Sequence, residues 1–159
     1  MIFRNAFVGA ALAALTALPA AAATAVPVDG GWLAVYFGNV GSGFSEEPFT
    51  FTLTRAATLK VTDAFADGDQ FEIFNFGASL GLTSTPTNDG ANVGGDFDAA
   101  FADARWSSGM WALGAGSYSI TGLTILSPYG GGEAALMVAS SDVPLPAAGL
   151  MLMTGLAGI

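Results

Sequence analysis

The sequence predicts an all-β protein, an antiparallel β-sandwich with one short helix. The main observation is the segment 49–54, where apolar and hydroxyl side chains alternate with the period of two that is typical of a strand with one buried face. Glycine and phenylalanine are abundant, at 22 and 12 of the 159 residues. This composition favours strands and tight turns over helices.

Five further segments have strand character, and turn residues separate them at short intervals. These segments are residues 32–37, 59–62, 70–73, 117–121 and 133–138. Many short strands joined by turns are typical of an antiparallel sandwich. The exception is residues 96–105, where Phe97, Phe101 and Ala104 recur at helical spacing behind a potential capping residue, Asp96. We expect a short helix there, preceded by a long exposed loop over residues 85–95.

Residues 1–25 have the three parts of a secretory signal peptide. Arg4 supplies the positive charge, an apolar run follows over residues 6–18, and small residues end in the pattern Ala23-Thr24-Ala25. The apolar run is shorter than the roughly 20 residues that span a membrane, which argues against a permanent anchor. We expect a signal helix that is cleaved after Ala25, or alternatively after Ala23, followed by a sandwich domain over residues 26–140.

Residues 141–159 combine a linker, a motif with two prolines and an apolar end. The motif consists of Val143, Pro144, Leu145, Pro146 and Ala147. It resembles the VPLPA variant of the PEP-CTERM sorting signal of exported Gram-negative bacterial proteins. The resemblance implies recognition by an exosortase-type transpeptidase, contact with the membrane through a C-terminal apolar helix before processing, and a final place at the cell surface or in an exopolysaccharide matrix. The two prolines hold the motif extended and keep helix from running back into the domain.

The apolar end departs from the pattern of that family. Residues 147–159 would form about 20 Å of helix, against a hydrocarbon core of about 30 Å. The basic tail that normally stops translocation is also absent. We therefore expect the sequence to be truncated within a transmembrane segment, with a degenerate signal as the alternative. The order of segments between residues 28 and 140 is similar to a jelly-roll-like domain of exported proteins that carry this signal, and no enzymatic activity comes with that likeness.

Composition excludes several kinds of chemistry. Cysteine and histidine are absent, so disulfides, thiolate catalysis, histidine acid–base chemistry and ordinary zinc sites are excluded. The sequence contains 13 acidic residues and only 4 basic ones, so the protein is strongly acidic. A surface of this sign repels phosphate, so we expect no nucleic-acid partner.

Three groups of carboxylates are candidates for chemistry: Glu46 with Glu47; Asp63 with Asp67 and Asp69; and Asp96 with Asp98 and Asp89. Turn and cap roles explain Asp67, Asp69 and Asp96, so paired-carboxylate catalysis is not expected. Calcium binding is the better functional interpretation of Asp63, Asp67 and Asp69, because calcium takes oxygen ligands that loops can supply. The twelve-residue calcium-loop pattern is missing, however, and we expect no other cofactor.

Five aromatic residues could form a surface on which sugars stack: Trp32, Tyr36, Trp106, Trp111 and Tyr129. Core packing is the simpler use of such residues. Trp106 is the candidate for exposure because it follows Arg105 and precedes two serines in a loop-like stretch. The sequence thus predicts an exported, non-catalytic protein of structural or adhesive type, displayed on the cell surface or outside the cell. The alternative is a glycan-binding sandwich module, with calcium as an optional aid.

Overall fold

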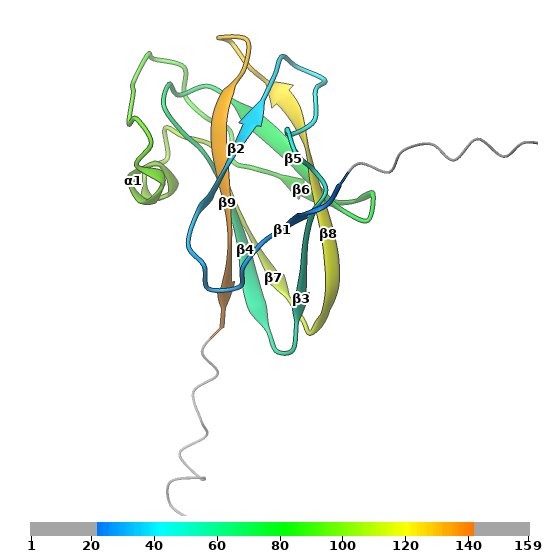
Figure 1. The fold of residues 1–159 in the computed structure, drawn as a ribbon. Helices are drawn as coiled ribbons and strands as arrows, with labels where there is room; N and C mark the ends of the chain where they lie inside the picture. The colour runs from blue at the N-terminus through cyan, green and yellow to red at the C-terminus, as the bar shows by residue number, and fades with distance from the viewer. Residues whose placement is uncertain (1–21, 142–159) are drawn as a thin grey trace, which may run out of the picture.

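The computed structural model of the protein describes residues 22–141, which form nine strands and one helix (Figure 1). The elements are β1 (Thr24–Ala25), β2 (Leu33–Phe37), β3 (Phe49–Leu53), β4 (Ala57–Asp63), β5 (Gln70–Asn75), β6 (Ala78–Leu82), α1 (Phe97–Ala102), β7 (Ser108–Leu113), β8 (Gly116–Leu126) and β9 (Gly132–Ser140). The predicted signal helix and C-terminal apolar helix lie outside the described residues. Between residues 22 and 141, no helix is both long and apolar enough to cross a membrane.

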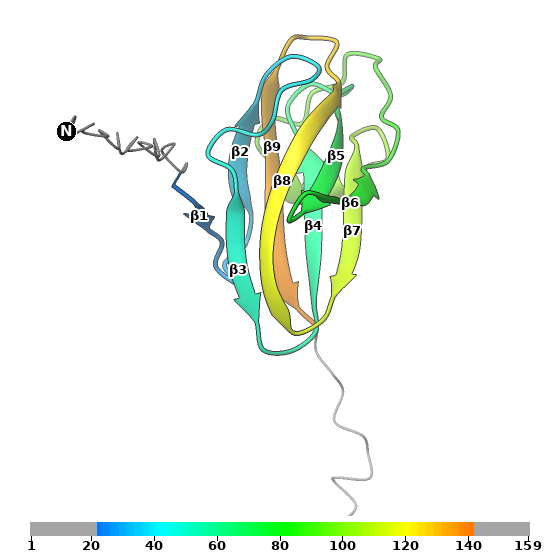
Figure 2. The same ribbon diagram turned by 90° about the vertical axis from the view of Figure 1, so that its right-hand side faces the viewer.

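The strands form two sheets that pack face to face (Figures 1 and 2). One sheet has the order β1-β3-β8-β5-β6 and the other the order β2-β9-β4-β7. Neighbouring strands are antiparallel, except that β1 runs parallel to β3. From β2 to β9, this is the strand order of an eight-stranded jelly roll. The predicted antiparallel β-sandwich is confirmed.

The alternation of side chains decides which face of each strand is buried. In β3, Phe49, Phe51 and Leu53 point into the core, while the threonines between them face outward. Large buried side chains from both sheets fill the space between them, among them Leu59, Phe71, Ile73, Ile120 and Leu136. Burial of this apolar surface is the main force that holds the sheets together.

Besides the two-residue β1, which falls within the predicted signal peptide, two strands, β6 and β7, have no counterpart in the predicted set. Each contains a glycine, Gly81 or Gly109, and most of their side chains are at least partly exposed. Neither therefore shows the alternation that identifies a half-buried strand. The tertiary structure makes them strands by pairing β6 with β5 and β7 with β4.

The predicted helix is present, although shorter than the segment 96–105. The side chain of Asp96 accepts a hydrogen bond from the backbone N–H of Ala99 at 3.0 Å, as expected for a cap. Trp32 packs against α1, with 5.5 Å between its ring centroid and that of Phe101. Its indole N–H donates to Asp98 at 2.8 Å.

Four connecting segments gather at one end of the sandwich: residues 38–48, 64–69, 83–96 and 127–131. The last of these leads directly into β9, which runs the length of the domain and ends at Ser140 at the opposite end (Figure 1). We call the end that carries the four segments the loop end.

Candidate functional site

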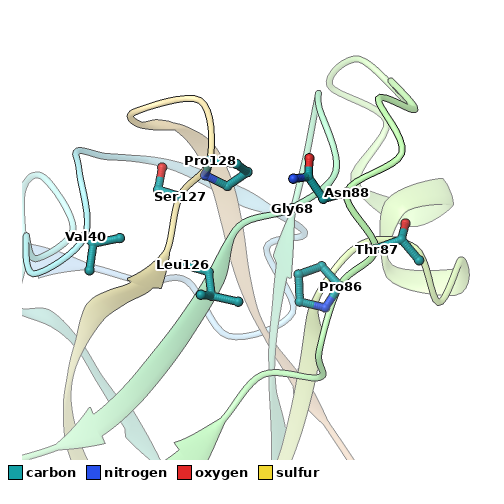
Figure 3. Close-up of a pocket in the computed structure, with 8 residues that line it drawn as sticks. All are labelled: Val40, Gly68, Pro86, Thr87, Asn88, Leu126, Ser127 and Pro128. Atoms are coloured by element: carbon teal, nitrogen blue, oxygen red, sulfur yellow. The ribbon is translucent and has the colours of Figure 1, made fainter.

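A cleft of about 280 Å³ opens at the loop end (Figure 3). All four connecting segments contribute to it, together with the end of β8. Its lining consists of Val40, Gly68, Pro86, Thr87, Asn88, Leu126, Ser127 and Pro128. The surface is therefore mostly apolar, with an amide and two hydroxyl groups, and no charged side chain lines it.

Asp67 holds one wall of the cleft in place. Its carboxylate accepts hydrogen bonds from the Thr87 hydroxyl at 2.5 Å and from the backbone N–H groups of Asp89 and Gly90 at 3.1 and 3.0 Å. Burial acts to raise the pKa of Asp67, but these hydrogen bonds outweigh it and hold the pKa below its ordinary value. The segment that carries Thr87 and Asn88 is thus tied to the β4–β5 connection.

Tyr129 stands beside the cleft with 55% of its surface exposed, and its hydroxyl donates to the side-chain oxygen of Asn88 at 2.9 Å. The turn that carries it is tight. At Gly131, where φ is +117°, an added Cβ would lie 2.7 Å from the carbonyl oxygen of Phe37. Only glycine fits there. Tyr129 is therefore an exposed aromatic ring on a defined turn next to a neutral hydrogen-bonding group.

Two carboxylates, Asp63 and Asp69, are buried near the loop end. Asp63 is fully buried, and its carboxylate accepts from the backbone N–H groups of Ala64 at 2.8 Å and Asp69 at 3.3 Å. Burial, and next the charge of Asp69, raise the pKa of Asp63 to about 8. Burial also raises the pKa of Asp69, against a hydrogen bond from Ser127. Asp63 is therefore mostly protonated at neutral pH.

The predicted calcium site over Asp63, Asp67 and Asp69 is not what the structure shows. The carboxylate of Asp67 is turned toward residues 87–90, while Asp63 is enclosed by backbone donors. Throughout residues 22–141, no group of three or more Asp or Glu side chains is arranged to hold a metal ion. Asp63 and Asp69 lie close together, whereas the carboxylate of Asp67 is directed to other partners, so the three acids do not converge on one point.

The predicted exposure of Trp106 is wrong. Its surface is only 2% exposed, and its indole N–H donates to the carbonyl oxygen of Phe65 at 3.1 Å. The Arg105 guanidinium lies 4.9 Å from the centre of the ring. Trp106 is thus a core residue, and it offers no free face to a sugar.

The other predicted aromatic residues do not gather into one surface. Trp32 packs on α1, and Trp111 packs against the core while donating to the carbonyl oxygen of Leu80 at 2.8 Å. Tyr36 is 59% exposed on β2. Among the five, Tyr129 is the one whose side chain forms a hydrogen bond with a residue that lines the loop-end cleft.

Three of the remaining acidic candidates, Glu47, Asp89 and Asp96, accept hydrogen bonds from backbone N–H groups. Glu47 accepts from the backbone N–H groups of Phe44 and Gly122 at 3.3 and 2.9 Å and so joins the β2–β3 connection to β8. Asp96 caps α1, and Asp89 accepts from the backbone N–H of Ala91. The bond of Asp96 agrees with the cap role expected from the sequence.

The structure describes the predicted signal-cleavage residues but not the predicted sorting motif. Ala25 lies in β1, just before the predicted domain boundary at residue 26, and Ala23 is exposed immediately before that strand. The sorting motif Val143, Pro144, Leu145, Pro146 and Ala147 lies outside the described residues.

Comparisons with known proteins bear on the fold at most. No family model matches the chain, and no curated protein matches it. Among solved structures, the chain is similar to the C-terminal CBM6 of LamC, a marine laminarinase from Zobellia galactanivorans, at 21% identity and a TM-score of 0.38. The match covers 63% of this chain and 75% of that one. Neither a shared family nor a shared site follows from a likeness of this size.

Proposed function

We propose that this protein is an exported, non-catalytic β-sandwich that binds a neutral glycan in the loop-end cleft. The observation that carries the proposal is the lining of the cleft, in which apolar side chains are combined with neutral hydrogen-bonding groups beside an exposed tyrosine. Sugar rings present apolar C–H faces and a rim of hydroxyl groups, so they complement such a surface. Ligand sites in general combine an apolar lining with a few placed polar groups.

Charge favours a neutral ligand over an anionic one. The chain has a formal net charge of −9, and no Lys or Arg lines the cleft. Asp67 and Asp69 lie close behind the cleft wall, since the neighbouring Gly68 and the hydrogen-bonded Thr87 and Ser127 are lining residues. A uronic acid or sulfated sugar would meet this negative potential without a compensating cation.

The same carboxylates argue against hydrolysis. Glycoside hydrolysis requires an acid and a carboxylate that both reach the bound sugar. Asp67 is fully buried and Asp69 is 4% exposed, and neither lines the cleft. Asp63 has a pKa suited to an acid at neutral pH, but it is fully buried and enclosed by backbone. These positions support binding without bond cleavage.

Affinity electrophoresis of residues 22–141 tests the proposal, with hydroxyethyl cellulose, laminarin, xylan and dextran as neutral probes and alginate as an anionic one. We expect retardation by at least one neutral probe and none by alginate. Tyr129→Ala should remove most of that retardation, whereas Tyr36→Ala, a matched change of an exposed tyrosine on β2, should leave it intact. Absence of retardation by every neutral probe would refute glycan binding.

The second proposal concerns delivery. Residues 143–147 would be the recognition element of an exosortase-type enzyme, as their resemblance to the VPLPA signal implies. Its support in the fold is the course of β9, which begins at the loop end and leaves the domain at the opposite end (Figure 1). Nine residues of strand span about 30 Å. Attachment through the C-terminal segment would therefore leave the cleft facing away from the point of attachment.

Mass spectrometry of the protein from a host that contains an exosortase tests the delivery proposal. We expect the wild-type chain to lose its C-terminal apolar segment and a Pro144→Ala/Pro146→Ala variant to keep it. Equal processing of both chains would contradict recognition of the motif. The N-terminal peptide in the same experiment would report whether cleavage follows Ala25 or Ala23.

A further inference from the structure

The outer face of β3 and β8 carries a row of hydroxyl groups. Where β3 pairs with β8, the outward positions are occupied by Ser or Thr, and the pairs Thr50–Ser119 and Thr52–Ser117 lie directly opposite each other. The hydroxyl oxygens of Thr52 and Ser117 are 3.3 Å apart. We call these four residues the hydroxyl face.

A shallow groove lies over this face. Its volume is about 320 Å³, and its lining consists of Thr50, Phe51, Thr52, Phe76, Ser117, Tyr118 and Ser119. The side chains of Phe51 and Tyr118 pack on the core side, where their rings stack at 5.2 Å between centroids, so Phe76 is the residue that supplies an exposed ring to the groove. No lining residue is charged. The groove therefore offers hydroxyl donors and acceptors together with aromatic carbon.

Phe76 is the unusual member of the groove. It lies in the two-residue turn between β5 and β6, and its surface is 69% exposed. Both turn residues have positive φ, +47° for Phe76 and +79° for Gly77. Such turns strongly prefer Asn-Gly, since a bulky residue is strained in the left-handed region. The backbone N–H of Phe76 donates to the carbonyl oxygen of Ser119 at 2.9 Å, which places the turn beside β8.

Phe76 is thus unfavourable for the folded protein in two respects. Its backbone is strained, and its ring is left in water instead of the core. An asparagine would relieve both costs. A ligand that covers the ring would explain why phenylalanine occupies this position, because binding would remove the apolar ring from water.

We infer that Phe76 and the hydroxyl face form a second contact site for a neutral polysaccharide. The ring would stack on one sugar, while the hydroxyl groups of Thr52 and Ser117 would exchange hydrogen bonds with its neighbours. The absence of charge among the lining residues favours a neutral chain over an anionic chain or a charged peptide. The inference deepens the proposed function and rests on it for the class of ligand.

The position of the groove suits one chain that reaches both sites. Ser119 and Leu126 belong to the same strand, and seven residues of strand correspond to about 20 Å. A polysaccharide long enough to bridge this distance would gain affinity by avidity, whereas a short oligosaccharide would occupy one site at a time.

The decisive variant is Phe76→Asn. It should melt at a higher temperature than the wild type, because Asn-Gly suits the turn, and yet bind a retarding polysaccharide roughly fivefold more weakly, the size expected for one lost stacking contact. Thr52→Val keeps the shape and strand preference of the residue while removing its hydroxyl, and should also weaken binding. Met110→Thr is the matched control, since Met110 is 65% exposed on the other sheet.

The outcomes separate the second site from the proposed function. If Tyr129→Ala reduces retardation while Phe76→Asn and Thr52→Val do not, the loop-end cleft binds glycan and the second site is refuted. If Phe76→Asn and Thr52→Val reduce retardation while Tyr129→Ala does not, the second contact site is supported and the proposal for the loop-end cleft is refuted. If no probe retards the wild-type protein, and the wild type forms a dimer that Phe76→Asn abolishes, then a second copy of the chain covers Phe76. Both glycan proposals are then refuted.

Discussion

Replacing Asp63 by asparagine should stabilise the protein at neutral and alkaline pH. The carboxylate lies at the end of β4, fully buried, and the structure provides it with two backbone N–H donors and no cation. An asparagine could keep the bond from the Ala64 N–H. Its NH₂ group would replace the oxygen that accepts the longer bond from the Asp69 N–H at 3.3 Å, a loss of about 1 kcal/mol that is smaller than the gain worked out below. The substitution removes a charge that the fold does not stabilise.

The magnitude follows from the pKa. A rise from 3.8 in the unfolded chain to about 8 in the folded one corresponds to roughly 6 kcal/mol at about 1.4 kcal/mol per unit, an upper bound for the cost of ionising Asp63. Below pH 4 the group is protonated in both states and the cost is absent. Between pH 4 and 8 the unfolded chain releases the proton first, so stability falls as the pH rises.

Urea denaturation followed by tryptophan fluorescence, at half-unit steps from pH 4 to 9, measures this effect. The wild type should lose stability toward pH 8, and Asp63→Asn should flatten the curve and gain at least about 1.4 kcal/mol at pH 8. Glu46→Gln is the matched control, since it removes the same charge from an exposed position. An Asp63→Asn variant that is no more stable than the wild type at pH 8, with an unchanged slope, would refute the reasoning.

Three further predictions concern named contacts. Asp67→Ala leaves the donors of Thr87, Asp89 and Gly90 without their acceptor. It should lower the free energy of unfolding, measured by urea denaturation, by about 1–3 kcal/mol and increase amide hydrogen exchange over residues 86–91. Unchanged exchange over these residues would contradict the anchoring role. Trp106→Ala should cost about 3–5 kcal/mol by the same measurement, because the ring is buried, and a cost below 1 kcal/mol would contradict that burial. Asp96→Ala should cost about 1 kcal/mol through the lost cap of α1, whereas Asp96→Asn, which keeps the acceptor, should cost less.

Acid should destabilise the protein through a different carboxylate, Asp67. The pKa of Asp67 is held below its ordinary value, so its contribution to stability is present above pH 4 and is lost as the pH falls through the lowered pKa. The carboxylate Asp63 acts in the opposite sense at higher pH. Together, these two groups place the maximum of stability near pH 4, where in the folded protein Asp67 is ionised and Asp63 is still protonated.

Local patterns determined the fold class and several element positions. The alternation over residues 49–54 can bury Phe49, Phe51 and Leu53 only if the segment is a strand, since successive side chains of a strand point to opposite faces. The cap at Asp96 is similarly local, because its acceptor and donor are three residues apart. Where pattern and burial coincide within a few residues of sequence, prediction and structure agree.

Tertiary contacts decided the candidate sites. Nothing within ten residues of Trp106 shows that Phe65 will accept its indole N–H, or that Asp67 will turn away from Asp63 to hold the segment around Thr87. The loop-end cleft joins four segments that are distant in the chain and adjacent only because the strand order β2-β9-β4-β7 and β3-β8-β5-β6 brings their connections to one end. The sequence alone therefore determined a sandwich of the right class, whereas the burial of a charge and the lining of a cleft depend on neighbours that only the folded chain supplies.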